Sequence, residues 1–162
     1  MILDLTLTKT PVGSMALYGA GDELLTLRLD GAVGADTPHE RFLTRHLGAF
    51  TTRRTDDAAG AAARLRRYFA GELEALDEQP LRILGTDFQR ATWEQLRTVR
   101  PGRTLSYAGL AQLVGRPNAV RAVAAANGTL WGYGGGLPMK QWLLRHEGAQ
   151  FTPLPEQESL PL

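Results

Sequence analysis

Leucines alternate with polar residues at the start of the chain, the pattern of a β-strand that buries one face. Leu3, Leu5 and Leu7 each have a polar neighbour, and the same period of two returns from residue 25 to residue 29. Residues 15–18 are a further apolar stretch, and glycine-containing turns separate the three segments. Residues 1–30 are therefore expected to form an antiparallel meander.

Two helices and one short strand are predicted next. Thr37 and Glu40 have the spacing of a capping box, with proline at the first helical position, so a helix should begin at Thr37 and end before Gly48. Residues 51–54 fit a short edge strand. Residues 56–70 are rich in alanine and arginine and predict a second helix.

The second half of the chain has the pattern of several short helices. A connector at residues 72–82 contains a proline and is the best boundary between two domains. Thr86 and Gln89 again have capping-box spacing. Residues 107–114 and 117–126 then predict two helices joined by a glycine-containing turn, a helix-turn-helix.

The chain is expected to end in one more helix and a loose tail. A glycine-rich stretch precedes a helix at residues 138–146, which Gly148 should terminate. The tail contains three prolines. The expected division is residues 1–80, residues 81–150 and a flexible tail at residues 151–162.

Composition narrows the possible functions. The 162 residues include no cysteine, which excludes disulfides, thiolate metal sites and thiol catalysis. The three histidines lack metal-ligand spacing, so no metal site and no cofactor are expected. No apolar run reaches the ~20 residues of a membrane span, and the N-terminus lacks a secretion signal. A cytoplasmic protein without membrane contact is the expectation.

Charge is unevenly distributed along the chain. The net charge is only +1, but residues 81–150 hold nine Lys and Arg against three Asp and Glu. This asymmetry is typical of a surface that faces a polyanion, although a solvated arginine-rich surface explains the charge alone equally well.

The second helix of the predicted helix-turn-helix is unusually rich in alanine. Side chains this small let a helix backbone come close to another surface, and Arg121 is the one long cation among them. Such an arginine can enter a base stack or a minor groove. The competing interpretation is an alanine-rich packing helix with one arginine that extends to solvent.

Two further features admit both a functional and a structural interpretation. The stretch Trp131-Gly132-Tyr133-Gly134-Gly135 suits a pocket wall that stacks on a flat base, and equally suits a tight turn with core aromatics. Glu147 lies where a helix end disfavours anions, so it needs a partner elsewhere in the fold unless it belongs to an exposed charged pair with His146.

Taken together, these features resemble the methylated-DNA–protein-cysteine methyltransferases, also called alkylguanine-DNA alkyltransferases. The resemblance covers about residues 81–149, and residues 1–80 fit the small N-terminal lobe of the family. It implies an α+β fold with a ribonuclease-H-like antiparallel sheet lobe and a C-terminal winged-helix or helix-turn-helix lobe. The matching residues include Phe88-Gln89, Trp93, Pro101-Gly102, Ser106-Tyr107, Asn118-Ala119, Arg121-Ala122-Val123, Ala126-Asn127-Gly128, Lys140 and Glu147.

The resemblance also implies site residues. Tyr107 would turn the target nucleotide out of the duplex and Arg121 would fill the space left in the stack. The base pocket would involve Trp131, Tyr133, Gly134, Gly135 and Glu147, where the acid of the family orients the histidine that activates the thiol. Further DNA contacts are expected from Gln89, Ser106, Ala108, Arg116 and Ala122.

The chain departs from the family where the chemistry occurs. Between the Ala-Asn-Gly and Gly-Tyr elements the family has an Asn-Pro hinge, an apolar strand and a Pro-Cys-His-Arg turn, whereas here only residues 129–131 lie between Gly128 and Gly132. Three residues span at most about 3.5 Å each, too little for a hidden strand. Alkyl transfer to sulfur needs a thiolate, so no catalytic residue is predicted.

The sequence thus predicts a DNA-binding protein of alkylation repair or damage recognition without alkyl transfer, similar in this respect to the cysteine-less alkyltransferase-like proteins. Its partners would be double-stranded DNA, with or without alkylated guanine, and excision-repair proteins, and the protein would be a monomer. Two alternatives stay open: an active methyltransferase, and a decayed scaffold that binds only proteins.

Overall fold

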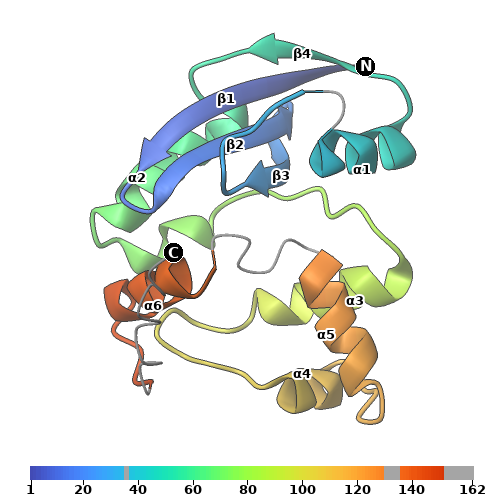
Figure 1. Cartoon of the computed structure of the whole chain (residues 1–162), viewed down its shortest axis with the longest axis vertical. Coiled ribbons are helices and arrows are strands. Elements are labelled where there is room, and N and C mark those ends of the chain that lie inside the picture. Colours follow the sequence, from blue (N-terminus) through green and yellow to red (C-terminus); the bar gives the residue numbers. More distant parts are fainter. Residues whose placement is uncertain (35–36, 130–135, 152–162) are drawn as a thin grey trace, which may run out of the picture.

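The computed structural model describes residues 1–34, 37–129 and 136–151 of the chain. A four-stranded sheet with two helices forms the sheet lobe, and four more helices form the helical lobe (Figure 1). This α+β architecture confirms the predicted fold class. The elements are β1 (Ile2–Thr10), β2 (Gly13–Ala20), β3 (Glu23–Arg28), α1 (Pro38–Leu47), β4 (Thr51–Arg54), η1 (Ala58–Gly60), α2 (Ala61–Phe69), η2 (Leu73–Leu76), α3 (Asp87–Leu96), α4 (Tyr107–Leu113), α5 (Val120–Thr129) and α6 (Gly136–His146).

The predicted meander is present in the first three strands. β1 pairs antiparallel with β2, and β2 pairs antiparallel with β3. The predicted edge strand β4 also forms, but it runs parallel to β1, with Ile2 opposite Thr51 and Leu5 opposite Arg54. The sheet, ordered β3-β2-β1-β4, is therefore mixed rather than purely antiparallel.

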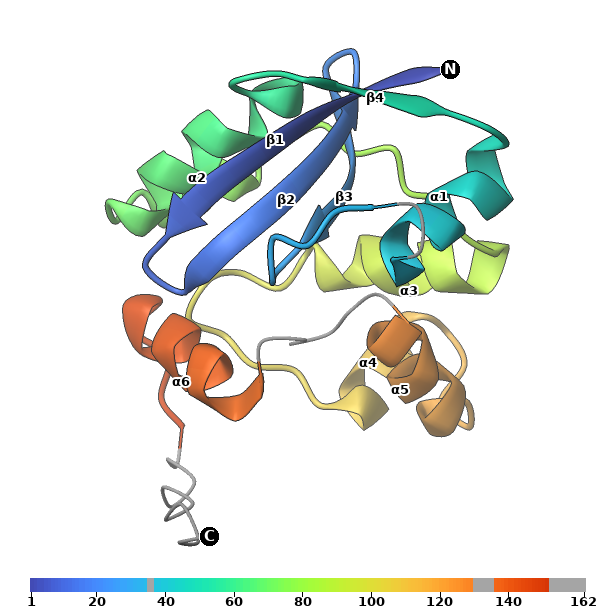
Figure 2. The same ribbon diagram turned by 45° about the horizontal axis from the view of Figure 1, so that its top comes forward.

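Each face of the sheet is covered by one helix (Figure 2). Met15 and Leu17 of β2 pack with Leu65 of α2 on one face. Ala16 and Tyr18, which point the opposite way, share a cluster with Leu43 of α1. Because successive side chains of a strand alternate between faces, the apolar run of β2 fits an internal strand that is buried on both faces.

The second predicted helix begins later than expected. Ala59 and Gly60 have positive φ values of 56° and 67°, which interrupt the helical path after the single 3₁₀ turn η1. The Asp57 carboxylate accepts hydrogen bonds from the amides of Ala62 (2.7 Å) and Ala63 (3.2 Å) and so serves the start of α2. The sequence prediction, which began this helix at residue 56, missed the cap because the residue types around Ala59 do not signal a positive φ.

The connector that was predicted as a domain boundary lies along the edge of the sheet. The Leu24 amide donates to the Pro80 carbonyl (2.9 Å), and the Arg82 amide donates to the Leu24 carbonyl (3.1 Å). The Arg82 guanidinium also pairs with Glu23 at 2.5 Å. These contacts cover β3, whose backbone groups would otherwise be an open edge.

The helical lobe largely follows its sequence signals. Thr86 and Gln89 form the complete capping box of α3, and Ser106 caps α4. α5 begins at Val120 rather than near Pro117, because the residues before it form a turn in which the Ala119 amide donates to the Arg116 carbonyl (2.9 Å). In the described part of the chain, no helix is both long and apolar enough to span a membrane.

Candidate functional site

The predicted helix-turn-helix exists and turns its predicted contact residues to solvent. Tyr107 and Ala108 begin α4, and Arg121 and Ala122 lie in the first turn of α5. All four are exposed, and half of the Tyr107 surface (50%) stays accessible although tyrosine is a large apolar residue. Leu105, just before α4, and Leu113, within it, are exposed as well, at 38% and 52%.

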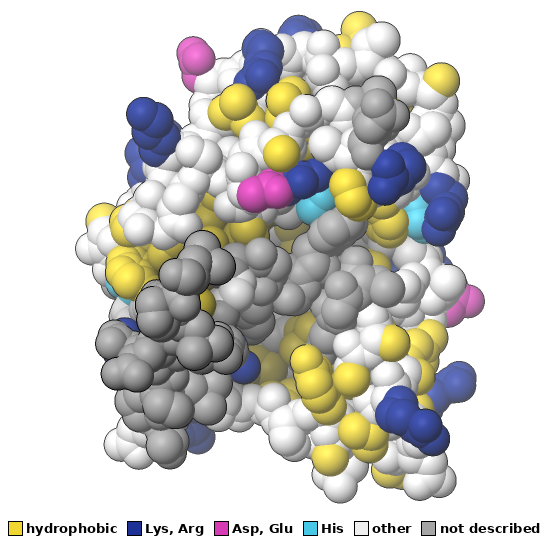
Figure 3. All heavy atoms as spheres, in the orientation of Figure 1, with side chains coloured by type: hydrophobic (Ala, Val, Ile, Leu, Met, Phe, Trp, Pro, Cys, Tyr) yellow, Lys and Arg dark blue, Asp and Glu magenta, His cyan; other side chains and the backbone are white. Residues whose placement is uncertain are grey.

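The opposite sides of α4 and α5 hold this face in place. Leu110 and Ala111 of α4 pack against Val123 of α5, and all three are almost fully buried. Apolar side chains are visible beside Lys and Arg on the lower part of the molecule, where α4 and α5 lie (Figure 3). The small helix pair thus exposes aromatic, small and cationic side chains.

Three other predicted contact residues have structural partners in addition. The Ser106 hydroxyl accepts from the Gly109 amide (3.0 Å), and the Gln89 side-chain oxygen accepts from the Thr86 amide (2.9 Å). The Arg116 guanidinium lies over the Phe88 ring at 5.7 Å from its centroid. Exposed Arg116 remains near the α4–α5 turn, and Ser106 directly precedes Tyr107.

Glu147 is not part of an exposed charged pair with His146, and that interpretation is wrong. Its carboxylate accepts a hydrogen bond from the Tyr68 hydroxyl (2.6 Å) and another from the Gly102 amide (3.0 Å). The His146 ring nitrogen Nε2 lies 2.8 Å from the Tyr68 carbonyl, which can only accept, so this nitrogen carries the proton. Glu147 therefore has the distant partner that its position at a helix end requires.

The predicted base-pocket residues Trp131, Tyr133, Gly134 and Gly135 lie outside the described residues. Their part in a pocket stays a prediction from the sequence. Glu147 is the one member of that predicted set within the described part of the chain.

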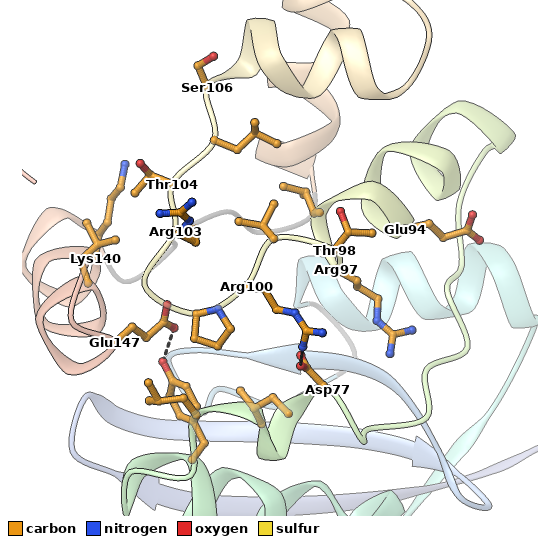
Figure 4. Close-up of a pocket in the computed structure, with 18 of the residues that line it drawn as sticks. Asp77, Glu94, Arg97, Thr98, Arg100, Arg103, Thr104, Ser106, Lys140 and Glu147 are labelled. Atoms are coloured by element: carbon orange, nitrogen blue, oxygen red, sulfur yellow. Dashed lines mark hydrogen bonds and ion pairs between the residues drawn. The ribbon is translucent and has the colours of Figure 1, made fainter. Parts of the chain in front are cut away.

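A cavity of about 1190 Å³ lies between the two lobes, directly beside Tyr107 (Figure 4). One wall is the loop from Arg97 to Ser106, another is α6 with Lys140 and Leu144, and Tyr68 and Leu73 contribute from the sheet lobe. Its volume is slightly above the range of about 300–1,000 Å³ typical of small-molecule sites. The cavity can therefore hold a group as large as a nucleotide.

Paired and cationic groups share the rim of the cavity. Arg100 is paired with Asp77 at 3.0 Å, and Arg97 donates to the Gln79 carbonyl (3.3 Å). Arg103 belongs to the loop wall of the cavity and Lys140 to the α6 wall (Figure 4). Among the described residues, no group of His, Asp and Glu is arranged to hold a metal ion.

Sequence reasoning missed the contributions of Tyr68 and of the loop side chains to this site. Tyr68 lies on α2, 79 positions before its partner Glu147, and is buried like any core aromatic residue. No spacing rule relates two such positions. The unusual anion at the end of α6 was the only available signal.

Comparison with known proteins gives the relatives of this chain. Residues 87–130 match the family model described as 6-O-methylguanine DNA methyltransferase, DNA binding domain. A methylated-DNA–protein-cysteine methyltransferase of Shigella flexneri is 44% identical over 107 residues, which cover 55% of this chain and 63% of that protein. The chain thus spans less than two thirds of the length of that relative.

Other relatives match nearly the whole chain. A methylated-DNA–protein-cysteine methyltransferase of Mycobacterium bovis is 36% identical over 156 residues, which cover 85% of this chain and 88% of that protein. The crystal structure of Mycobacterium tuberculosis O6-methylguanine methyltransferase superposes with a TM-score of 0.69 at 30% identity, with 96% of each chain covered. The structure of Mycobacterium tuberculosis OGT in complex with DNA gives the same TM-score at 31% identity, with 90% of this chain and 92% of that chain covered.

Proposed function

This chain belongs to the methylated-DNA–protein-cysteine methyltransferase family, and from that premise we propose that it binds duplex DNA and recognises alkylated bases without accepting the alkyl group. One observation carries the proposal. The whole sequence contains no cysteine, yet Tyr107 and Arg121 remain exposed on a well-formed helix-turn-helix. The surface expected to contact DNA is retained, whereas the thiol that would accept the alkyl group is missing.

The arrangement supports binding through the minor groove. Because Ala108 and Ala122 have small side chains, the backbone of α4 and α5 can approach the duplex closely. Arg121 is the long cation that can enter the stack. Tyr107 lies both on this surface and on the wall of the cavity. An extruded nucleotide would pass Tyr107 and enter the cavity, where Arg103 and Lys140 can face its phosphate.

Removal of the lesion would then require other proteins. A protein that holds an alkylated base but cannot take up the alkyl group leaves the DNA unrepaired. We therefore propose excision-repair proteins as partners, a monomer as the acting form, and the cytoplasmic compartment that holds the DNA as its place of action.

Substitution of Arg121 tests the DNA-binding part of the proposal. Arg121→Ala should weaken duplex binding by roughly 1–3 kcal/mol if the arginine enters the stack. Arg54→Ala is a matched control, since Arg54 is an exposed cation on β4, at the far end of the molecule from α4 (Figure 1). Fluorescence anisotropy with a labelled duplex at several salt concentrations measures both, and equal affinities for the two variants would contradict the proposal.

Two further measurements separate the alternatives. Incubation with benzylguanine or an O6-alkylguanine duplex should leave the intact mass unchanged, whereas a stoichiometric mass gain would identify an active transferase. Paired duplexes with and without one O6-alkylguanine should differ in affinity if the cavity accepts the lesion. A protein that binds neither duplex at low salt would instead be a scaffold for protein partners.

A further inference from the structure

The carboxylate of Glu147 joins three parts of the fold. It directly follows α6, one of its oxygens accepts from the Tyr68 hydroxyl of α2 (2.6 Å), and the other accepts from the Gly102 amide (3.0 Å). Tyr68 is buried and Glu147 is half-buried. Hydrogen bonds to an ionised acceptor are about twice as strong as neutral ones, and partial burial shields them from water.

The neighbouring contacts place α6 on the sheet lobe. His146 donates to the Tyr68 carbonyl (2.8 Å), and the His146 ring stacks on Trp142 with 5.0 Å between centroids. Phe69 of α2 lies 5.8 Å from the Trp142 ring. These contacts fix Glu147 relative to α2 independently of its contact with the loop.

The contact with Gly102 is close enough to require glycine. The φ value of Gly102 is +76°, and a Cβ atom there would lie 2.6 Å from the Glu147 carbonyl oxygen. A side chain at residue 102 would have to push the loop away from α6. The backbone at Gly102 thus approaches the end of α6 more closely than any other residue type permits.

These contacts determine the distance between two walls of the cavity. The loop that begins at Gly102 leads through Arg103 to Tyr107, and α6 carries Lys140 and Leu144 on the other side. Figure 4 shows the Glu147 carboxylate between the α6 ribbon and this loop. A loop released from Glu147 could move away from α6, and the cavity would change width.

We propose that Glu147 and Tyr68 form a clasp that holds the interlobe cavity at the width needed to receive an extruded nucleotide. The inference rests on the proposed function, and Glu147 acts in it as a positioning residue. The family resemblance implies that the acid at this position orients a histidine of a thiol site, and this chain has no cysteine. Here the same carboxylate would set the width of the cavity.

The clasp and the duplex-binding surface are held by different contacts. α4 and α5 are fixed to each other by Leu110, Ala111 and Val123, none of which contacts Glu147 in the apolar cluster. Loss of the clasp should therefore leave the duplex contacts of α4 and α5 intact and reduce only the fraction of molecules whose cavity can accept a base. The observed extent of extrusion falls in proportion to that fraction.

The test compares nucleotide extrusion with duplex affinity. The probe is a duplex that carries 2-aminopurine, whose fluorescence rises when the base leaves the stack. Tyr68→Phe should lower the fluorescence gain by about tenfold, the factor expected for loss of one strong hydrogen bond, and Glu147→Ala, which removes two, should lower it at least as much. Glu147→Gln, which keeps one acceptor, should retain more of the gain than Glu147→Ala. Duplex affinity should stay within about twofold of the parent protein, because neither residue is expected to contact the duplex.

Tyr18→Phe is the matched control. The Tyr18 hydroxyl donates to Glu40 (2.7 Å) in the sheet lobe, a tyrosine–glutamate bond of the same kind on the other side of the molecule. This variant should lose stability but keep the fluorescence gain. Equal gains for Tyr68→Phe and Tyr18→Phe would overturn the inference.

A second measurement separates failure of the clasp from failure of the proposed function. Hydrogen exchange at the Gly102 amide needs no DNA, and it should be slow in the parent and fast in Glu147→Ala. If the parent binds no duplex, the proposed function fails, and the clasp as a device for nucleotide binding fails with it. If the parent binds and extrudes the base while Gly102 exchanges fast, only the clasp is refuted.

Discussion

The sheet lobe and the helical lobe use apolar side chains in different ways. The sheet lobe buries Leu3, Leu17 and Tyr18 completely, in two clusters on the two faces of the sheet. In its described residues the helical lobe has one small cluster and leaves Tyr107 and Leu113 about half exposed, at 50% and 52%. Apolar side chains are exposed in the sheet lobe as well, such as Ile2 at 64% and Leu7 at 46%, so the two lobes differ in the size of their cores rather than in apolar exposure.

The contacts between the lobes combine polar bonds with the aromatic contacts of α6 on α2. Arg97 donates to the Gln79 carbonyl (3.3 Å), Arg100 pairs with Asp77 (3.0 Å), and Tyr68 donates to Glu147 (2.6 Å). Exposed ion pairs contribute only about 0–1 kcal/mol each, so the interface restrains the lobes without a continuous core. The orientation of the helical lobe therefore depends on a few directional bonds and on the aromatic contacts between α6 and α2.

The largest expected effect concerns the core of the sheet lobe. Leu17→Ala removes a fully buried side chain between β2 and α2 and should lower the free energy of unfolding by about 3–5 kcal/mol. Denaturation by urea, followed by circular dichroism, measures the change. A loss below about 1 kcal/mol would show that this core is less tightly packed than the burial indicates.

The same substitution in the helical lobe should act locally. Leu110→Ala leaves a void between α4 and α5 and should cost about 2–3 kcal/mol, with faster hydrogen exchange in both helices and weaker duplex binding. Amides of the sheet should keep their exchange rates. Equal acceleration in both lobes would mean that they unfold together, and the contrast drawn above would be wrong.

A smaller effect is expected from a single buried hydroxyl of the sheet lobe. Tyr18→Phe removes the hydrogen bond to Glu40 and should cost about 1.5–3 kcal/mol, since the acceptor is charged. Burial and the Glu40 carboxylate both raise the pKa of Tyr18 well above its usual value. Spectrophotometric titration of the tyrosines should show one fewer late-titrating group in the variant.

Acidification should destabilise the sheet lobe more than the helical lobe. Burial, and after it the nearby Arg28, lowers the pKa of His39 below its ordinary value of 6.5. The unfolded chain then binds a proton at a higher pH than the folded one, so stability is full above about 6.5 and falls as the pH drops below it. The pKa of neighbouring Asp30, held at about 2 by Arg28, keeps that carboxylate ionised in this range.

Comparison of unfolding at pH 7 and pH 5.5 tests this linkage. A His39→Gln variant, although less stable, should lose less stability on acidification than the parent protein. The difference should appear in sheet-lobe amides and not in α4 or α5. A parent and variant with identical pH dependence would assign the acid sensitivity to other groups.

Local chemistry was predictable from the sequence, whereas long-range pairing was not. Thr86 and Gln89 form the capping box that their spacing predicts. Thr37 caps α1 as expected, but the Glu40 carboxylate accepts from Tyr18 (2.7 Å) and from the Gly34 amide (2.9 Å). A spacing of three residues reports the local geometry and says nothing of a tyrosine 22 positions away.

The same limit applies to the sheet and the site. The hairpins of β1, β2 and β3 follow from short turns, but the parallel pairing of β4 joins residues such as Leu3 and Thr52 across two intervening strands and a helix. The contact surface on α4 and α5 followed from a family resemblance carried residue by residue. The cavity and the Tyr68–Glu147 bond arise only when α6 packs on α2, an arrangement with no periodic signature.

The position of α6 has a consequence for chain continuity. This helix follows α5 in sequence yet packs on α2, so the polypeptide returns to its first half after leaving it. A backbone cut at Gly85 should therefore yield two fragments that remain associated and reassemble when co-expressed. Split versions of the protein could be used as reporters whose assembly depends on the contacts of α6 with α2 and on the bonds that Arg97 and Arg100 make to the first fragment.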